Sequence, residues 1–304
     1  DKLVHLAAET GTGQSMYEIE HYFSVNVQGT ALLLDVLAND KVADSISSLV
    51  VASSRSIYGE GQYRCAIHGA VSPRQRDVLD MKKGCFDVSC PDCSGSVDLE
   101  KTSEKVPLKP LSYYGLTKQI QEQAVLMHAS NRDISGYGLR YQNVYGPGQS
   151  LKNPYTGILA IFSNLARQNS DIQVYEDGLE SRDFVYIDDV IDATFRSIDH
   201  QETYVGAMNV GSGVATSVID VASAIKSHFN SDSIITIGGE FRIGDIRHNI
   251  ADISLISGLL GYTPNTAFLD GLNNFLSWAE SEPVSDKLAY IESVDELSKR
   301  GLMG

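Results

Sequence analysis

Short apolar segments alternate with longer segments of helical spacing in the first half of the chain. We expect buried strands at residues 4–8, 48–52 and 137–141, where aliphatic and β-branched residues run together. The segments 16–39 and 112–129 are predicted to be helices. Strands that alternate with helices in this way form a parallel sheet with helices packed on its faces. The pattern therefore predicts an α/β fold, with ligands bound beyond the carboxyl ends of the strands.

The second half of the chain has a looser pattern and shorter predicted elements. They are helices over 157–168, 216–229 and 269–280, a strand that leads into a helix over 184–198, and short strands at 208–210 and 234–237. Thr216 or Ser217 is the expected N-cap of its helix, because a hydroxyl oxygen accepts a hydrogen bond from a free amide there. The charged tail after Pro283 is predicted to be a surface helix or a frayed end.

A polar stretch of about residues 60–107 interrupts the alternation and is expected to be irregular. We therefore assign the predicted sheet and this insertion to residues 1–146. Residues 147–304 are expected to form a smaller α/β domain. Segments near 184–210 are expected to pack back on the first domain.

The charge balance excludes several kinds of partner. The 304 residues include 24 Lys and Arg against 39 Asp and Glu, a formal net charge of −15. We expect neither nucleic acid nor a membrane as a partner, because both are anionic surfaces that require a basic face. No apolar run approaches the roughly 18–20 residues of a membrane span.

All four cysteines fall within the polar insertion. Cys65-x-x-His68 and Cys90-x-x-Cys93 have the spacing of two knuckles of a tetrahedral zinc site, and Cys85 is an alternative to His68 as the fourth ligand. The other interpretation is four free thiols in a polar loop. We expect a structural zinc, and the local clustering indicates a reducing compartment and a cytoplasmic protein.

Tyr114 and Lys118 are four residues apart on a predicted helix, so both side chains lie on one face. An ammonium near a phenol lowers the phenol pKa from its usual value of about 10. Such a tyrosine could remove a proton from a sugar or alcohol hydroxyl near neutral pH. Ser54, directly after a predicted strand, is placed to bind the same oxygen. The alternatives are a solvated Tyr-Lys pair and a serine-rich turn that caps the strand.

Several ordered motifs together resemble the extended short-chain dehydrogenase/reductase family, and specifically its nucleotide-sugar epimerases and dehydratases of the UDP-glucose 4-epimerase kind. Besides the Ser and Tyr/Lys motifs, the resemblance covers the segments 5–8, 26–30, 139–148, 181–190, 209–213, 242–245 and 260–264. It implies a Rossmann-like, doubly wound parallel sheet that binds NAD and a smaller α/β domain that binds a nucleotide-sugar.

The resemblance also implies roles for individual residues. Ser54, Tyr114 and Lys118 would be catalytic. The residues expected to contact NAD are Ala7, Ala8, Asn26, Ser53, Tyr114, Lys118, Tyr141 and Val144. The residues expected to contact the substrate are Ser54, Asn143, Arg182 and Arg242. Arginine suits a diphosphate because its donors are charged and paired in a fork. The alternative is that both arginines are ordinary surface residues.

The sequence departs from the family pattern in two respects. The glycine-rich Gly-x-x-Gly-x-x-Gly turn and the first strands that the resemblance implies are missing, so we expect an N-terminally truncated chain that binds NAD poorly and lacks activity by itself. Arg55 and Ser56 occupy the positions where the dehydratases carry an Asp-Glu pair. Neither residue can act as a carboxylic acid, which favours epimerisation over dehydration.

The resemblance therefore implies NAD-dependent epimerisation of a nucleotide-sugar, expected to be a UDP-sugar changed at C4. The sugar would be oxidised transiently to a keto-sugar, with Tyr114 as the base, in a homodimeric enzyme. The alternatives are a nucleotide-sugar reductase or decarboxylase of the same family and a non-catalytic binding protein on this fold.

Overall fold

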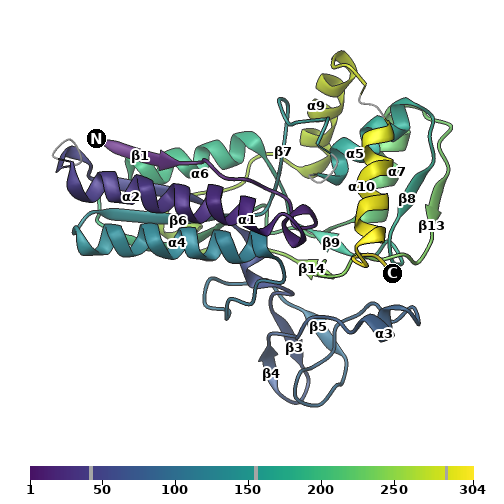
Figure 1. The fold of residues 1–304 in the computed structure, drawn as a ribbon, viewed down its shortest axis with the longest axis horizontal. Helices are drawn as coiled ribbons and strands as arrows, with labels where there is room; N and C mark the ends of the chain where they lie inside the picture. Colours follow the sequence, from purple (N-terminus) through teal and green to yellow (C-terminus); the bar gives the residue numbers. More distant parts are fainter. Residues whose placement is uncertain (41–43, 154–156, 285–286) are drawn as a thin grey trace.

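The largest sheet of the protein has four parallel strands. The computed structural model describes residues 1–40, 44–153, 157–284 and 287–304. The strand order is β1-β2-β6-β11, and every neighbouring pair is parallel (Figure 1). The strands are β1 (Lys2–His5), β2 (Ser48–Ser54), β6 (Ser135–Tyr141) and β11 (Val205–Val210). The predicted α/β fold with a parallel sheet is confirmed.

Helices cover both faces of this sheet. On one face lie α1 (Ile19–Tyr22), a π-helical segment at Phe23–Gln28, α2 (Gly29–Asn39) and α4 (Tyr113–Asn131); on the other lie α6 (Ile187–Asp199) and α8 (Ser254–Leu260). Alternate residues of β2 belong to different cores. Leu49 and Val51 pack with Leu37 and Val125, whereas Val50 packs on the other face with Val190. Buried residues on both faces explain the continuous apolar run of β2.

The second core is formed by helices around a short parallel pair of strands. The helices are α5 (Ile158–Arg167), α7 (Val218–His228), α9 (Phe268–Ser281) and α10 (Lys287–Lys299), and the strands are β8 (Ile172–Val174) and β13 (Ile235–Ile237). Ser217 caps α7 by accepting a hydrogen bond from the amide of Asp220 at 3.2 Å. The tail after Pro283 includes the helix α10.

Two small sheets connect the two cores. One pairs β7 (Asn143–Tyr145) with β10 (Phe184–Tyr186); the other has the order β12-β9-β14, formed by Thr216–Ser217, Ser181–Arg182 and His248–Asn249. They bring segments far apart in the sequence to the carboxyl end of β6.

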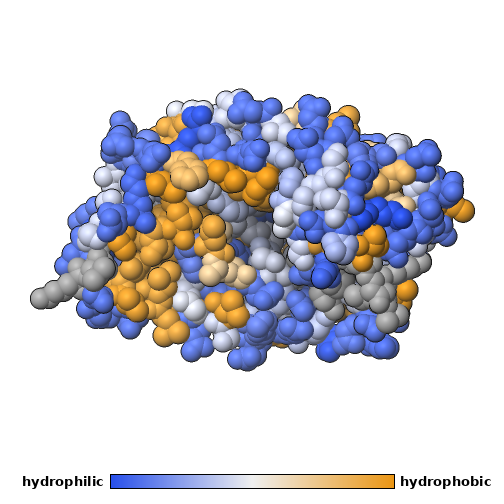
Figure 2. Space-filling model, turned by 90° about the horizontal axis from the view of Figure 1, so that it is seen from above, coloured by the Kyte–Doolittle hydropathy of each residue, from blue (hydrophilic) through white to orange (hydrophobic). Residues whose placement is uncertain are grey.

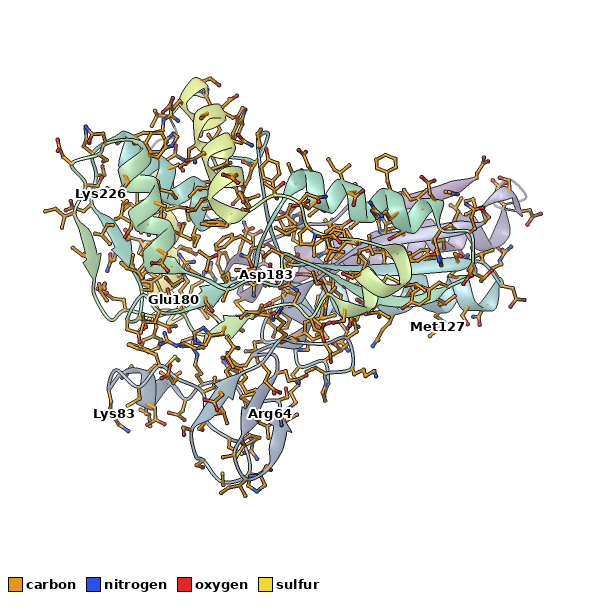
Figure 3. The ribbon with its side chains drawn as sticks, turned by 180° about the vertical axis from the view of Figure 1, so that it is seen from behind. Arg64, Lys83, Met127, Glu180, Asp183 and Lys226 are labelled. Carbon is orange, nitrogen blue, oxygen red and sulfur yellow. The ribbon has the colours of Figure 1, made fainter. Side chains whose placement is uncertain are left out.

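The insertion is more regular than expected. Residues 60–107 contain an antiparallel sheet of order β4-β3-β5 and a short helix, formed by Gly69–Val71, Tyr63–Cys65, Val97–Leu99 and α3 (Val78–Met81). The expectation of an irregular stretch is wrong because strands of three residues are too short to produce a readable alternation. The insertion projects from the body, with the exposed Arg64 on β3 and the exposed Lys83 just after α3 (Figure 3).

Apolar side chains gather on the surface at the end of the molecule that carries β1 (Figure 2). The exposed large apolar residues of this part of the chain include Leu6, Leu32, Val36, Ile191 and Phe195. In the described residues, no helix combines the length and the apolar character that crossing a membrane requires.

Candidate active site

A cleft of about 500 Å³ lies where the carboxyl ends of β2 and β6 meet the second core. This is the edge at which parallel α/β sheets bind ligands. The residues predicted for cofactor, substrate and catalysis line it with the exception of Ala7 and Asn26: Ala8, Ser53, Ser54, Tyr114, Lys118, Tyr141, Asn143, Val144, Arg182 and Arg242.

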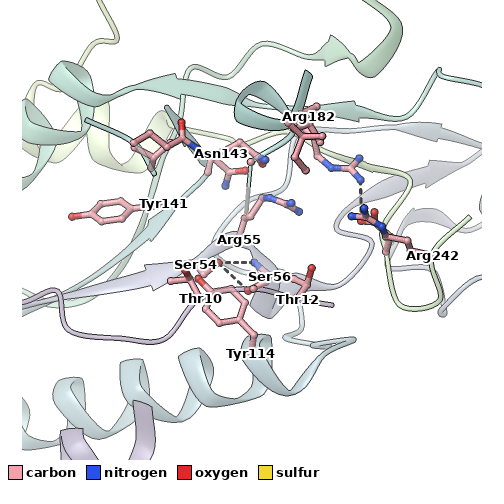
Figure 4. A pocket seen from close by; sticks show the side chains of 18 of the residues that line it. Thr10, Thr12, Ser54, Arg55, Ser56, Tyr114, Tyr141, Asn143, Arg182 and Arg242 are labelled. Carbon is pink, nitrogen blue, oxygen red and sulfur yellow. Dashed lines mark hydrogen bonds and ion pairs between the residues drawn. The ribbon is translucent and has the colours of Figure 1, made fainter. Parts of the chain in front are cut away.

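Ser54 and Tyr114 meet at the end of β2 (Figure 4). Ser54 begins a 3₁₀ turn over Arg55–Tyr58, and its Oγ accepts hydrogen bonds from the amide of Ser56 at 3.2 Å and from the Ser56 hydroxyl at 2.9 Å. Tyr114 lies in the first turn of α4, and the neighbouring Ser54 lowers the pKa of its phenol. The predicted Ser-Tyr pair therefore comes together in one cleft.

The close approach of α4 to this turn depends on Gly115. A Cβ at this position would lie 2.6 Å from the carbonyl oxygen of Ser56, a distance that real side chains do not tolerate. Ser112 caps the helix by accepting a hydrogen bond from the Gly115 amide at 3.1 Å. The local sequence Ser112-Tyr113-Tyr114-Gly115 thus places Tyr114 against Ser54.

The pKa of Tyr114 differs from the expectation that Lys118 would lower it. Burial raises this pKa, and the neighbouring Ser54 hydroxyl and the positive charge of Arg55 lower it only in part. The ammonium of Lys118 instead donates a hydrogen bond to Gln121 Oε1 at 2.5 Å. Burial also lowers the pKa of Lys118 itself to about 8, against the opposing effect of Glu122. In this arrangement Arg55 is the cation that favours the phenolate.

Ala7 and Asn26 lie behind the cleft rather than in its wall. The Ala7 carbonyl accepts a hydrogen bond from Gln121 at 3.2 Å. Asn26 is fully buried, and its amide donates to the Glu9 carbonyl at 3.1 Å and to Thr117 Oγ1 at 3.0 Å, while its oxygen accepts from the Glu9 amide at 2.7 Å. Both residues hold the loop after β1 against α4. The expected contacts of Ala7 and Asn26 with NAD stay a prediction.

Ser53 connects the cleft to a buried ion pair. Its hydroxyl donates to Glu122 Oε2 at 2.6 Å, and Glu122 accepts two hydrogen bonds from Arg140 at 2.7 and 3.0 Å. Arg140 also donates to the Tyr58 hydroxyl at 2.8 Å. Because these side chains come from β2, α4, β6 and the 3₁₀ turn, the network fixes the floor of the cleft. This network of side chains could not be predicted, because no local sequence pattern marks partners that lie far apart along the chain.

The opposite wall of the cleft carries arginines. The guanidinium of Arg182 donates to the carbonyls of Ser181, Arg247 and Ile246 at 2.8–2.9 Å and to Asp245 Oδ1 at 3.1 Å. Arg182 therefore shapes the wall, and most of its donors are already used. Arg242 stacks on the ring of Tyr175 at 4.9 Å, and its Nε has no hydrogen-bond partner among the described residues.

Arg55 adds a third guanidinium to the cleft. Burial lowers its pKa to about 10, and Arg182 lowers it further. Arg55, Arg182 and Arg242 all act on the carboxylate of Asp245 and hold its pKa below the usual range. Glu176 and Glu180 also line the cleft, so its suitability for an anionic diphosphate rests on the guanidinium donors rather than on a net positive charge.

Several buried polar atoms in the cleft lack partners among the described residues. They are both amide atoms of Gln142, Asn143 Oδ1, Gln149 Oε1 and Arg242 Nε. Unsatisfied buried polar groups are costly and are usually completed by a bound ligand or water. Two of these atoms are donors and three are amide oxygens that accept, a mixture that fits the phosphates and hydroxyls of a nucleotide-sugar. The hydroxyl and ammonium groups of Tyr114 and Lys118 fit the nicotinamide ribose end of NAD.

Other lining residues were missed from the sequence. Thr10 and Thr12 come from the loop after β1, and Tyr175 and Tyr290 come from the second core. The two tyrosines sit in no local motif, so only the tertiary fold reveals them. Arg55 follows the predicted Ser54 directly in the sequence, but its position at the dehydratase Asp-Glu pair indicates only that a carboxylic acid is missing there.

Asp183, next to Arg182, lies at the centre of the molecule (Figure 3). It is fully buried and accepts hydrogen bonds from the amides of Ser212, Gly213 and Ala251 at 2.7–3.1 Å and from the Ser212 hydroxyl at 2.7 Å. These bonds tie the loop after β11 to the arginine wall.

The insertion brings together the four residues predicted as metal ligands. The ligand atoms of Cys65, His68, Cys90 and Cys93 all lie within 4.8 Å of one another. Cys85 is an exposed free thiol and is not part of this group. Of the two alternatives for the fourth position, the structure has His68.

Comparisons with known proteins agree with this geometry. The sequence model of the NAD dependent epimerase/dehydratase family matches residues 1–80 and 88–211. The dTDP-L-rhamnose 4-epimerase of Burkholderia thailandensis is 38% identical over 280 residues, which are 92% of this chain and 75% of that protein. A putative UDP-glucose 4-epimerase of Methanocaldococcus jannaschii is 26% identical over 282 residues, 92% of this chain and 77% of that protein.

Solved structures show the same fold. MoeE5 in complex with UDP-glucose and NAD matches with a TM-score of 0.72 at 27% identity, over 92% of this chain and 79% of that chain. With a family match over most of the chain, a relative at 38% identity and Ser54, Tyr114 and Lys118 lining one cleft, this chain belongs to the NAD dependent epimerase/dehydratase family.

Proposed function

We propose that this protein is an NAD-dependent nucleotide-sugar epimerase that inverts C4 of the sugar. The observation that carries the proposal is that Ser54, Tyr114 and Lys118 line one cleft together with an arginine wall. Bound NAD would supply the acceptor for a hydride and its return. Tyr114 would remove the proton of the sugar hydroxyl, and Ser54 would hold the same oxygen.

The contacts assigned to individual residues are part of this proposal. Ala8, Ser53, Lys118, Tyr141 and Val144 would contact NAD. Asn143 and Arg242 would bind the nucleotide-sugar, supported by the unpartnered Asn143 Oδ1 and Arg242 Nε. Arg182 would act mainly by orienting Asp245, since its own donors are occupied. Residues 1–146 would bind NAD and residues 147–304 mainly the nucleotide-sugar.

A UDP-sugar is the expected substrate, and a dTDP-sugar is the second candidate. The second candidate is favoured by the relative at 38% identity, which is a dTDP-L-rhamnose 4-epimerase. The same family includes a UDP-N-acetyl-alpha-D-glucosaminuronate decarboxylase of Bacillus cytotoxicus at 24% identity. Reduction or decarboxylation is therefore the alternative chemistry.

The deciding experiment is to incubate the protein and NAD with UDP-glucose, UDP-glucuronate and dTDP-L-rhamnose and to follow the sugar protons by NMR. We expect the C4 epimer of one of them, with no net change in NADH. Release of carbon dioxide or accumulation of NADH would instead favour decarboxylation or net redox chemistry. Binding of every sugar without turnover, also by a protein that carries the glycine-rich NAD turn, would favour a binding protein.

We also propose that the protein is a homodimer that packs through α2 and α4. Val25, Leu32 and Val36 are exposed at intervals of seven and four residues, which forms one apolar stripe along the π-helical segment and α2. Met127 is an exposed apolar residue of α4. Apolar faces of this kind mark association surfaces.

The insertion would hold a zinc with a structural rather than a catalytic role, since the cleft already contains the groups that the redox chemistry needs. None of the four cysteines forms a disulfide bond. A cytoplasmic location is proposed because thiols persist in reducing compartments.

A further inference from the structure

The four-residue cluster in the insertion has the dimensions of a tetrahedral metal site. Cys65 Sγ lies 3.8 Å from Cys93 Sγ and 3.6 Å from His68 Nδ1, and Cys90 Sγ lies 3.4 Å from His68 Nδ1. Zinc bonds of about 2.3 Å to sulfur and about 2.0–2.1 Å to nitrogen separate two sulfurs by about 3.8 Å and a sulfur and a nitrogen by about 3.5 Å. The observed separations therefore surround a space that fits one Zn²⁺.

Hydrogen bonds of the backbone around the cysteines hold the thiol groups in positions suited to one metal ion. Cys90 and Cys93 are linked by a tight turn in which the Ser94 amide donates to the Cys90 carbonyl at 2.9 Å and the Cys90 amide donates to the Gly95 carbonyl at 2.9 Å. Ser94 has a positive φ of 56°, which is unusual for a residue other than glycine. At the other knuckle, the Ile67 amide donates to Cys65 Sγ at 3.4 Å, as amides do to metal-bound thiolates.

The insertion also contacts the arginine wall of the cleft. Phe86 packs edge-to-face on Phe241 with ring centres 6.5 Å apart, and Met81 joins the same buried cluster with Ile243. These two contacts hold Phe241 and Ile243, the residues on either side of Arg242, in place. Cys90, a candidate metal ligand, follows Phe86 by four residues in the sequence.

Charged side chains add further contacts between the insertion and the segment 241–247. Arg76 is buried and donates to the Asp245 carbonyl at 3.0 Å and to Glu176 Oε2 at 2.8 Å. Asp87 accepts a hydrogen bond from Arg247 Nε at 2.9 Å. Residues 76–87 therefore hold the segment 241–247 by contacts at four points.

We propose that Cys65, His68, Cys90 and Cys93 bind one Zn²⁺ and that the metal keeps the insertion in the shape that holds residues 241–247 in place at the cleft. The first part is independent of the protein's activity. The second part rests on the proposed function where it concerns nucleotide-sugar binding. Apart from the metal, the two knuckles are joined by the antiparallel pairing of β3 with β5, in which Cys65 lies opposite Val97. Without the metal, the turn at Cys90–Cys93 would keep only this attachment within the described residues and would loosen.

The metal site is tested on the purified protein, prepared without chelator, by elemental analysis and by exchange of its metal for Co²⁺. We expect about one zinc per chain and the intense visible absorption of tetrahedral, thiolate-bound Co²⁺. Cys90→Ser and Cys93→Ser should lose both signals. Cys85→Ser is the matched control and should retain them, because Cys85 lies outside the cluster. Zinc well below one per chain, or the weak spectrum of octahedral Co²⁺, would overturn the site.

The coupling to the cleft is tested by amide hydrogen exchange with and without chelator. We expect faster exchange in residues 60–107 and also in residues 241–247, whose Phe241 and Ile243 amides are hydrogen-bonded to Gly304 and Leu302. Faster exchange confined to the insertion would overturn the coupling while leaving the metal site intact. Neither result depends on turnover, so failure of the proposed activity is distinguishable from failure of this proposal.

A third measurement concerns the substrate. Cys93→Ser should bind UDP at least about tenfold more weakly than Cys85→Ser in calorimetry, the effect of losing one charge-assisted hydrogen bond. Equal affinities in the two variants would show that the metal does not support the arginine wall.

Discussion

The guanidinium of Arg140 meets the carboxylate of Glu122 through two hydrogen bonds of 2.7 and 3.0 Å, and both side chains are buried. The pair links β6 to α4 beneath Ser53. Its position shows that the helix that carries Tyr114 is attached to the sheet by a charged contact as well as by apolar packing.

Replacing Glu122 with Gln should lower the free energy of unfolding by about 3–5 kcal/mol, because Arg140 would be left buried with an uncompensated charge. Urea unfolding followed by circular dichroism measures this loss. Asp192→Asn is the matched control, since it removes an exposed Arg196 partner and should cost less than about 1 kcal/mol. Equal losses in the two variants would contradict the assigned role of the buried pair.

Tyr114→Phe should abolish epimerisation but leave nucleotide binding within about twofold, because only the hydroxyl at Ser54 is removed. Turnover by NMR and UDP affinity by calorimetry test the two parts. Tyr113→Phe changes the neighbouring tyrosine, which does not line the cleft, and should keep its activity. Substantial turnover by Tyr114→Phe would exclude it as the base.

Arg55→Gln should move the pH dependence of turnover to higher pH. The positive charge of Arg55 lowers the pKa of Tyr114, so its removal raises that pKa further. If Tyr114 acts as phenolate, the rate rises with pH through this pKa, and the rising limb shifts upward. A pH series of kcat measures the shift. Arg74→Gln, an exposed arginine of the insertion, is the control and should leave the limb unchanged.

His248 should make the protein less stable in acid. Burial lowers its pKa to about 4, and its Nδ1 accepts hydrogen bonds from Ser181, so the folded state holds the neutral ring. Since the unfolded residue has a pKa of about 6.5, the unfolded state binds more protons between pH 6.5 and 4. Stability contributed by this residue is complete above pH 6.5 and is lost as the pH falls toward 4.

His248→Gln should therefore reduce the slope of unfolding free energy against pH in that interval, as measured by urea unfolding from pH 4 to 7. His21→Gln, on the exposed α1, serves as the comparison. An unchanged slope in His248→Gln would mean that other groups dominate the acid response.

Leu32→Glu should weaken the proposed homodimer, because a charge on the apolar stripe of α2 cannot be buried against a second copy. Sedimentation velocity over a concentration series should show a shift toward the monomer. Ile234→Glu changes an equally exposed apolar residue near β13 and should leave the association state unchanged. A dimer that tolerates Leu32→Glu must use another surface.

Much of the candidate site could be predicted because its residues sit in local patterns. Ser54 follows a buried strand, Tyr114 and Lys118 share a helical face, and Cys65, His68, Cys90 and Cys93 form two knuckles; the structure brings the members of each group together. The effect of Arg55 on the pKa of Tyr114, by contrast, has no local pattern. It depends on the turn of the chain after β2, which brings the two side chains near each other.

The parallel α/β sheet and the Ser, Tyr and Lys groups of the cleft are predictable because alternating burial and helical spacing are local properties of the chain. The electrostatics of the cleft arise from the tertiary fold. Burial raises the pKa of Tyr114, Gln121 takes the hydrogen bond of Lys118, and Arg182 is occupied by carbonyls from a distant loop. Charge interactions depend on distance and solvent access, and these are set by contacts between segments far apart in the sequence.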